Sequence, residues 1–325
     1  PSLDGLHEML DHMEILSKAI RKRRQERGNI NFDFDEPLIT IDEDGVPIDI
    51  QVEDRRVANE IIEDFMLLAN ETVAERYPHR DVPFLYRVHE EPSEEKLKEL
   101  NIIMRPFGYK LDLSEDVTPR QIQELTEAIE GKDEETLIST VILRSMQKAH
   151  YSESSLGHFG LAARYYAHFT APIRRYNDLI VHRIIKLDLK NKYRGRVLGK
   201  YERNLPQIAK HISNTERQAQ EAERKVQDVK IAQYMKDRIG EVYPAKVSGI
   251  TSFGIFAQLD NTIEGLISYT TMTDDHYVFD EENYWAVGKA RGKVYTMGQE
   301  VKVEVTGANP IMGKVDFIFV GDKNE

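Results

Sequence analysis

Residues 158–183 read HFGLAARYYAHFTAPIRRYNDLIVHR, and they hold the most informative local pattern in the chain. Glycine and aromatic residues dominate the first half, which is typical of an irregular loop. Thr170 is a suitable N-cap, and Pro172 suits the first turn of a helix, where its missing N–H costs no hydrogen bond. The sequence therefore predicts a helix over residues 171–190, entered from this loop.

Arg174 and Arg175 fall in the first turn of that predicted helix, where the helix dipole disfavours cations. An anion would offset two such charges. Free backbone N–H groups and two guanidinium groups at one helix start together form a phosphate site. The alternative is structural, with the arginine pair held by Asp178 and nearby glutamates.

The charge of the chain is unevenly distributed. The whole chain of 325 residues carries a net charge of −12, from 44 basic and 56 acidic residues. Residues 151–240 hold 18 Lys and Arg against 9 Asp and Glu, so this stretch is basic within an acidic chain. Such a stretch is typical of a groove that binds nucleic acid. An ordinary solvated helix face would have the same charge count.

Composition excludes several classes of protein. The chain has no cysteine, which excludes disulfide scaffolds, thiolate zinc sites and a cysteine nucleophile. A membrane-spanning helix needs about 20 consecutive apolar residues, and no such run occurs. The charged segment 3–27 is unlike a secretory signal. We therefore expect a soluble, cytoplasmic protein with no membrane partner.

Regular elements are expected over most of residues 1–240. A polar amphipathic helix is expected at 4–27, and a strongly apolar one at 57–77. The second helix carries Glu63 and Asn70 seven residues apart at the border of its apolar face. These two side chains fit ribose binding or, alternatively, a buried polar network.

A long helix is predicted at 204–238, and it carries Glu216 and Glu223 seven residues apart on one face. Either glutamate could orient arginines of the preceding helix or act on a substrate. Surface salt bridges are the simpler interpretation for each of them.

The character of the chain changes after Gly240. Five short strands with turn residues between them, spread over about 80 residues, predict a small OB-type barrel. We place a helical domain at 1–240 and a β-barrel domain at 241–325, which gives an α+β fold class. Three aromatic residues with one nearby cation suggest a platform on which single-stranded bases stack, although an isolated phenylalanine is more often part of a core; they are Phe253, Phe256, Tyr269 and Lys246.

With these residues in view, the chain resembles the RNase II/RNase R family of exoribonucleases, whose catalytic part is the RNB domain. The block 158–183 is long and specific for that family. The resemblance extends over most of residues 1–240 through RGNINFDFDE (27–36), IIEDFMLLANETVA (61–74), YRVHEEP (86–92), LRSMQKAHYS (143–152) and TERQAQEAERKVQD (215–228). The segment SFGIFAQLDNTIEGLI (252–267) resembles an RNA-binding OB domain first described in a ribosomal protein. This pairing is most similar to the C-terminal part of bacterial RNase R-type members.

The resemblance implies processive 3′→5′ hydrolysis of single-stranded RNA to nucleoside 5′-monophosphates. By motif position, Arg174 would contact the scissile or terminal phosphate, and Glu223 would lie close to the active site, with Glu216 the less favoured match. Phe32 matches the aromatic residue that stacks on the 3′-terminal base, and Glu63 matches a carboxylate near the terminal ribose. The remaining RNA-binding candidates of this region are Asn70, His158, Arg175 and Tyr176.

The resemblance also implies Mg²⁺, but the chain departs from the family at the metal site. The family has four aspartates in a D-x5-D-x-D-D arrangement, which is absent here; the pairs Asp42/Asp44 and Asp274/Asp275 lack the spacing. We therefore expect no metal ligands on this chain and a partnership with an N-terminal part of the same protein that would carry them. The alternative is a non-catalytic module that binds single-stranded RNA.

Overall fold

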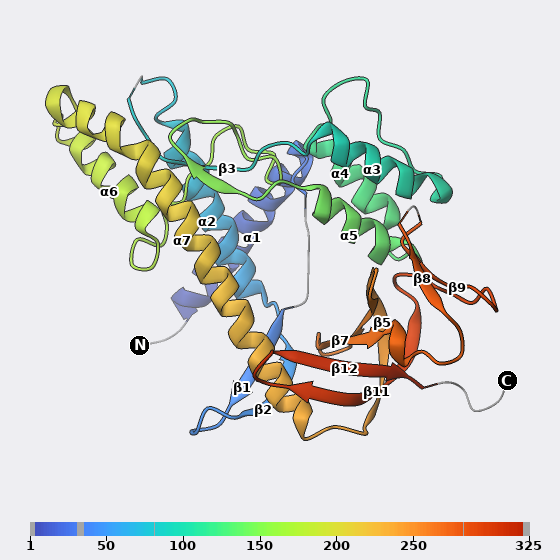
Figure 1. Ribbon diagram of the computed structural model, residues 1–325. Helices are drawn as coiled ribbons and strands as arrows, with labels where there is room; N and C mark the ends of the chain where they lie inside the picture. Colours follow the sequence, from blue (N-terminus) through green and yellow to red (C-terminus); the bar gives the residue numbers. More distant parts are fainter. Residues whose placement is uncertain (1–3, 31–35, 81, 282, 321–325) are drawn as a thin grey trace.

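The computed structural model describes residues 4–30, 36–80, 82–281 and 283–320 (Figure 1). Helices and two small β-ladders form one part of the molecule, and strands β5–β12 form the other. The expected mixture of helix and sheet is therefore confirmed. Within the described ranges, no helix has both the length and the apolar character needed to cross a membrane.

Helices α1 (Asp4–Arg27) and α2 (Val57–Glu75) pack against each other through a buried ion cluster. Its centre is Asp64 of α2, whose side chain is only 1% exposed. The Asp64 carboxylate accepts hydrogen bonds at 2.6–2.9 Å from three groups of α1, which are Ser17 Oγ, Arg21 Nη2 and Arg24 Nη2. Between the two helices the chain forms a hairpin of β1 (Pro37–Ile41) and β2 (Pro47–Val52).

Three short helices follow β3 (Tyr86–Val88), and the first two begin at residues whose side chains cap them. Ser93 caps α3 (Glu94–Met104) by accepting from the backbone N–H of Lys96. Thr118 and Gln121 form a capping box at the start of α4 (Pro119–Ile129). A short 3-10 helix, η1 (Arg105–Phe107), separates α3 from α4, and α5 (Glu135–Ser145) completes the group before β4 (His150–Ser152) pairs antiparallel with β3.

Helix α6 (Tyr176–Leu189) begins five residues later than the sequence predicted. Arg175 is its N-cap, with an extended backbone (φ −118°, ψ 116°), so the helix cannot continue back to Ala171. Residues 171–175 form a separate turn, in which the backbone N–H groups of Arg174 and Arg175 both donate to Ala171 O. The predicted position of the two arginines inside the first helical turn is therefore wrong.

Helix α7 (Gly195–Lys236) is 42 residues long and runs the length of the helical part (Figure 1). It begins earlier than predicted, and Pro206 lies inside it. The flanking residues Leu205 and Ala209 are 0% and 2% exposed, so tertiary packing holds the helix together where proline removes one backbone hydrogen bond.

The five strands predicted for the C-terminal part are confirmed and form a ring in the order β11-β12-β7-β6-β5, with β11 also pairing with β5. Gly265 in β7 has no side chain because the ring of Phe317 lies against it; a Cβ there would be 2.4 Å from that ring. The strands are β5 (Val242–Thr251), β6 (Gly254–Leu259), β7 (Glu264–Ser268), β11 (Glu300–Asn309) and β12 (Lys314–Phe319).

A second small sheet, which the sequence analysis did not predict, lies between β7 and β11. After the short 3-10 helix η2 (Tyr269–Thr271), it consists of β8 (Tyr277–Asp280), β9 (Trp285–Gly288) and β10 (Val294–Tyr295). These strands are only two to four residues long, too short for an alternating pattern to stand out.

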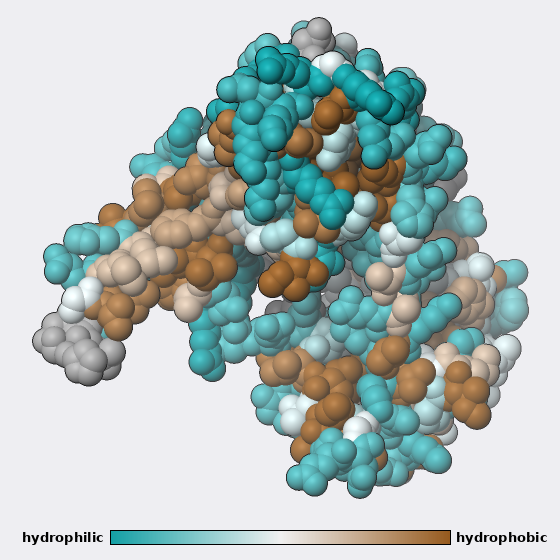
Figure 2. All heavy atoms as spheres, turned by 90° about the vertical axis from the view of Figure 1, so that its left-hand side faces the viewer, coloured by the Kyte–Doolittle hydropathy of each residue, from teal (hydrophilic) through white to brown (hydrophobic). Residues whose placement is uncertain are grey.

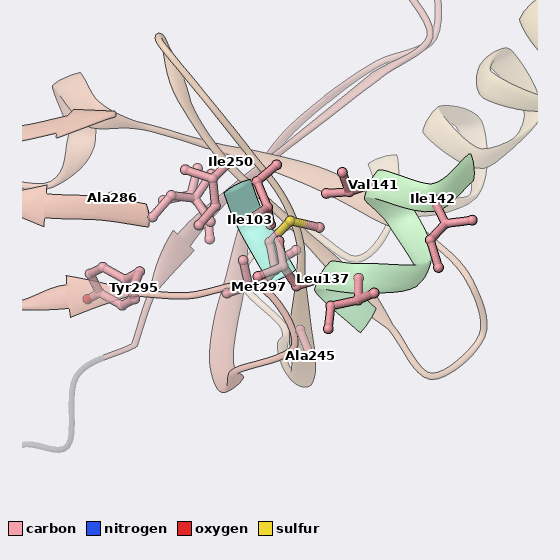
Figure 3. Close-up of a cluster of buried hydrophobic side chains, with 14 of the residues drawn as sticks. Ile103, Leu137, Val141, Ile142, Ala245, Ile250, Ala286, Tyr295 and Met297 are labelled. Atoms are coloured by element: carbon pink, nitrogen blue, oxygen red, sulfur yellow. The ribbon is translucent and has the colours of Figure 1, made fainter. Parts of the chain in front are cut away.

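The helical part and the strand-rich part share one hydrophobic core (Figure 3). Ile103 of α3 and Leu137 of α5 lie beside Ile250 and Met297 of the strand-rich part. All four side chains are buried, with exposures of 1–6%. The strands therefore pack directly against the short helices.

Candidate functional site

The loop 157–175 carries the candidate site, and buried contacts fix it to the elements beneath. His158 and Ala163 exchange backbone hydrogen bonds of 2.8 and 3.2 Å across a tight turn. Asn70 of α2 holds the next segment, because its amide donates to Tyr166 Oη at 3.0 Å and its carbonyl oxygen accepts from Phe169 N at 2.9 Å. The loop is therefore held rigidly where it leads into the arginine pair.

Arg175 has a structural partner. Its Nη2 and Nε donate to Asp178 Oδ2 at 2.8 and 3.2 Å, and the same oxygen accepts from Ala171 N at 2.7 Å. Asp178 is 0% exposed, so the pair is well shielded from water. For Arg175, the structural interpretation of the arginine pair is the one that the geometry supports.

Arg174 is different. Its side chain is exposed, and within the described residues no hydrogen bond or ion pair reaches its guanidinium group. The neighbouring Ile173 is fully exposed. The turn 171–175 therefore presents one free guanidinium group outward, on a backbone that Asp178 holds in place. Such a group can bind a phosphate through two N–H donors at once.

A polar network lies behind this turn and includes a glutamate that the sequence analysis ranked second. Arg87 Nη1 donates to Glu216 Oε2 at 2.5 Å, and Tyr151 Oη donates to Glu216 Oε1 at 3.3 Å. A 2.9 Å hydrogen bond joins Tyr151 Oη and His168 Nδ1. Glu216 of α7 is thus connected to the loop that carries Arg174.

Burial keeps the histidines of this region neutral. It lowers the pKa of His168 to about 2, assisted by the nearby positive charges of Arg175 and Arg87. It lowers the pKa of His158 to about 3 and that of His89 below its ordinary value. None of the three carries a charge near neutral pH, so the positive potential of the site comes from its arginines.

Two residues that were predicted to bind RNA, Asn70 and His158, make contacts within the protein. Asn70 is 0% exposed, and its buried polar network is the alternative interpretation given above. The ring of His158 packs edge-on between His89 and Tyr166, at centroid distances of 5.1 and 5.2 Å. Asn70 is therefore not accessible to RNA in this structure, whereas His158 is partly exposed and its assignment stays a prediction.

The remaining candidates of the helical part lie at or near the surface. Glu223 is exposed and has no hydrogen bond or ion pair within the described ranges, so it does not join the network of Glu216. Glu63 is paired with Arg55 at 2.5 Å. Tyr176 is 51% exposed and borders a groove of about 590 Å³ between α6 and α7. Phe32 lies outside the described residues.

In the strand-rich part, the predicted aromatic residues are brought together. Phe253 is 56% exposed and meets Phe256 edge-on at 6.0 Å between ring centroids. The backbone N–H of Tyr269 donates to Phe253 O, while its hydroxyl donates to Thr251 O at 2.8 Å. Lys246 is opposite Gln258, two residues along β6 from Phe256 and therefore on the same face.

The described residues do not fit a metal site. They contain no group of three or more histidine or acidic side chains placed to hold one ion. The pairs Asp42/Asp44 and Asp274/Asp275 serve local structure instead: Asp42 Oδ1 accepts from two backbone N–H groups of its own turn, and Asp275 does so from Ala290 and Arg291.

Comparison with known protein families gives two matches. A model described as the RNB domain matches residues 2–191, and one described as the S1 RNA-binding domain matches residues 236–316. Ribonuclease R of Aquifex aeolicus is 44% identical over 317 residues, covering 96% of this chain and 44% of the relative. Ribonuclease R of Escherichia coli is 34% identical over 322 residues, covering 97% of this chain and 40% of the relative. The chain thus spans less than half the length of these relatives.

Solved structures show the same likeness. RNase R of Mycoplasma genitalium in complex with ribose-methylated single-stranded RNA superimposes with a TM-score of 0.89 at 31% identity, over 96% of this chain and 49% of that one. The same protein in complex with double-stranded RNA gives 0.81 at 26% identity, over 96% of this chain and 50% of that one.

Proposed function

This chain belongs to the RNB family, and on that basis we propose that it forms the RNA-guiding part of a 3′→5′ exoribonuclease acting on single-stranded RNA. The products would be nucleoside 5′-monophosphates. The observation that carries the proposal is the free guanidinium group of Arg174, presented by a turn that Asp178 and Arg175 hold rigid. The RNA bound in the solved Mycoplasma relative supports the substrate class.

In this proposal Arg174 binds the phosphate under attack and stabilises the charge that builds on its oxygens in the transition state. A fixed donor of this kind contributes about 10²-fold or more to a rate because it does not need to reorganise during the reaction. Arg175 acts as a positioning residue, since its guanidinium group is already bound to Asp178. Glu216 supports the same loop through Tyr151 and His168.

The strand-rich part contributes RNA affinity in this proposal. The closed order of its strands and the S1 family match support an OB-fold for it. Phe253 and Phe256 are the residues available for stacking on unpaired bases, and Lys246 lies on the same face for the backbone. Tyr269 is held by the hydrogen bond from its hydroxyl to Thr251 O, and its backbone N–H donates to Phe253 O beside the two phenylalanines.

We further propose that Mg²⁺ serves the reaction through ligands outside the described residues, on an N-terminal part of the same protein that joins this chain. An apolar face offers a place for that part. It is formed by α1 and α2, and Figure 2 shows apolar side chains gathered along a projecting arm of the molecule. Its most exposed large side chains on the two helices include Leu6, Met9, Leu10, Ile15, Leu16, Ile62 and Leu68, at 42–66% exposure.

The experiment incubates 5′-labelled single-stranded RNA and Mg²⁺ with this chain alone, and with this chain plus a polypeptide corresponding to the unmatched N-terminal part of the relatives. We expect degradation to 5′-monophosphates only in the second mixture. There Arg174→Gln should lower kcat by about 10²-fold. An unchanged kcat would contradict the role of Arg174, whereas RNA binding without cleavage in both mixtures would favour the non-catalytic binding module.

A further inference from the structure

The hairpin formed by α6 and α7 carries a dense group of cations that the proposed site does not use. Residues 183–210 contain nine lysines and arginines but only two acidic residues, Asp188 and Glu202. The whole chain, by contrast, has a net charge of −12. The nine cations, called here the hairpin cations, are Arg183, Lys186, Lys190, Lys192, Arg194, Arg196, Lys200, Arg203 and Lys210.

The hairpin cations are exposed and unpaired. All nine side chains are exposed, and within the described ranges none of their charged groups makes a hydrogen bond or an ion pair. One of the two local acids is already occupied: Asp188 accepts from Arg76 at 3.2 Å and from Arg80 at 2.6 Å. These two arginines add positive charge beside the hairpin. The positive electrostatic potential of the hairpin is therefore not balanced by nearby acidic side chains.

The position of the hairpin links it to the candidate site. Helix α6 begins two residues after Arg174 and extends over 14 residues, which corresponds to about 21 Å. The groove lined by Tyr176 and His211 includes the first residue of α6, two residues after Arg174, and its lining on α7 lies next in sequence to Arg203 and Lys210. Figure 1 shows the hairpin projecting from the helical part, and Figure 2 shows hydrophilic residues over the upper part of that side.

We propose that the hairpin is a second RNA-binding surface, which holds the sugar–phosphate backbone of a strand outside the Arg174 site. The inference rests on the proposed function because it takes RNA as the ligand from it, but it concerns the hairpin cations rather than the Arg174 site. A phosphate backbone fits because it presents evenly spaced negative charges and requires no fixed geometry from lysine and arginine side chains. Continuity with the Arg174 turn favours RNA over an acidic protein.

The test measures binding of the full chain to a 30-nucleotide single-stranded RNA by fluorescence anisotropy at several salt concentrations. The hairpin variant carries Lys192→Gln, Arg196→Gln and Lys200→Gln. A matched control removes the same charge from exposed cations in and beside the short helices, through Arg105→Gln, Lys110→Gln and Arg144→Gln. A third variant, Phe253→Ala with Phe256→Ala, reports on the stacking platform. Circular dichroism verifies that each variant is folded.

We expect the hairpin variant to bind at least about tenfold more weakly at low salt, and its slope of log K against log salt to fall by about 2, because three phosphate contacts are lost. The control should retain the affinity of the original chain. If the hairpin variant binds as the original chain does while the platform variant is weakened, the hairpin proposal is wrong and the proposed function stands; an acidic protein surface then becomes the partner to test. If the original chain binds no RNA, both proposals fail.

Discussion

At the scale of single residues, Arg174 and Arg175 are adjacent in sequence but have opposite environments. Arg175 shares a buried oxygen of Asp178 with the backbone of Ala171, whereas Arg174 has no partner within the described residues. The difference follows from the turn 171–175, which directs one guanidinium group inward and leaves the other in solvent. One side chain therefore stabilises the turn and the other is available to an anion.

This difference predicts opposite effects on stability. Arg175→Gln should lower the free energy of unfolding by about 3 kcal/mol, because the buried Asp178 loses its charged partner. Arg174→Gln should change it by less than about 0.5 kcal/mol, as is usual for a surface substitution. Urea titrations of the two variants measure both values. Equal losses would show that Arg174 also has a structural partner.

The buried histidines predict how stability depends on pH. Their folded-state pKa values are lowered, to about 3 for His158 and about 2 for His168, so the unfolded chain takes up protons first as the pH falls. The free energy of unfolding should therefore be highest above about pH 6.5. Below that pH it should decrease by up to about 1.4 kcal/mol per pH unit for each histidine. Urea titrations between pH 7 and pH 4 measure this slope.

The variant His168→Gln isolates that contribution, because the carboxylates also titrate in this range. It should flatten the pH dependence by up to about 1.4 kcal/mol per pH unit. The control His7→Gln changes an exposed histidine of α1 and should keep the slope of the original chain. If His168→Gln leaves the slope of the free energy of unfolding against pH unchanged, His168 takes up its proton as readily in the folded chain as in the unfolded one.

At the scale of elements, α1 depends on α2 for its attachment. Much of the outer face of α1 is exposed. The helix is attached to α2 by hydrogen bonds from Ser17, Arg21 and Arg24 to the carboxylate of Asp64. A buried carboxylate with three donors organises the two helices more strongly than scattered surface pairs do.

Asp64→Ala should therefore lower the free energy of unfolding by about 3–5 kcal/mol, because two arginines lose a common buried partner. Hydrogen exchange should accelerate along α1 before it does in α7. The control Glu14→Gln removes the partner of Lys18 in a surface pair and should cost less than about 0.5 kcal/mol. An unchanged hydrogen-exchange rate in α1 of Asp64→Ala would show that Asp64 does not attach this helix to α2.

At the scale of the whole molecule, the helical and strand-rich parts are joined by a common core rather than by a flexible link. Met297 is 4% exposed and belongs to the cluster that includes Leu137 of α5 (Figure 3). A core that crosses the boundary predicted near residue 240 should make the two parts unfold together. It also fixes the Phe253 platform relative to the Arg174 turn.

Unfolding in urea can be followed by two signals, which we expect to coincide. Fluorescence of Trp285, the single tryptophan, reports on the strand-rich part, while far-ultraviolet circular dichroism reports mainly on the helices. Met297→Ala should shift both transitions together by about 2–5 kcal/mol, and the exposed Met312→Ala should shift neither by more than about 0.5 kcal/mol. Two separate transitions would show that the parts are independent.

Much of the secondary structure was predictable because its signals are local. Ser93 and Thr118 are typical N-cap residues and cap α3 and α4, and the five strands predicted after Gly240 are present. The prediction was wrong at the start of α6, where Thr170 and Pro172 suggested a helix that the extended backbone of Arg175 prevents. There the cause is not local, because the loop leading to the turn is tied to α2 through Asn70.

The sequence by itself determined the class of the fold, most helix and strand positions and the family, since these depend on periodicity, caps and motifs within short stretches. Only the tertiary structure decided which arginine is free, which glutamate joins the loop, and that Asn70 is buried. Those outcomes depend on partners far apart in the chain, such as Arg87 with Glu216. Burial then sets the cost of leaving any of these polar groups unpaired.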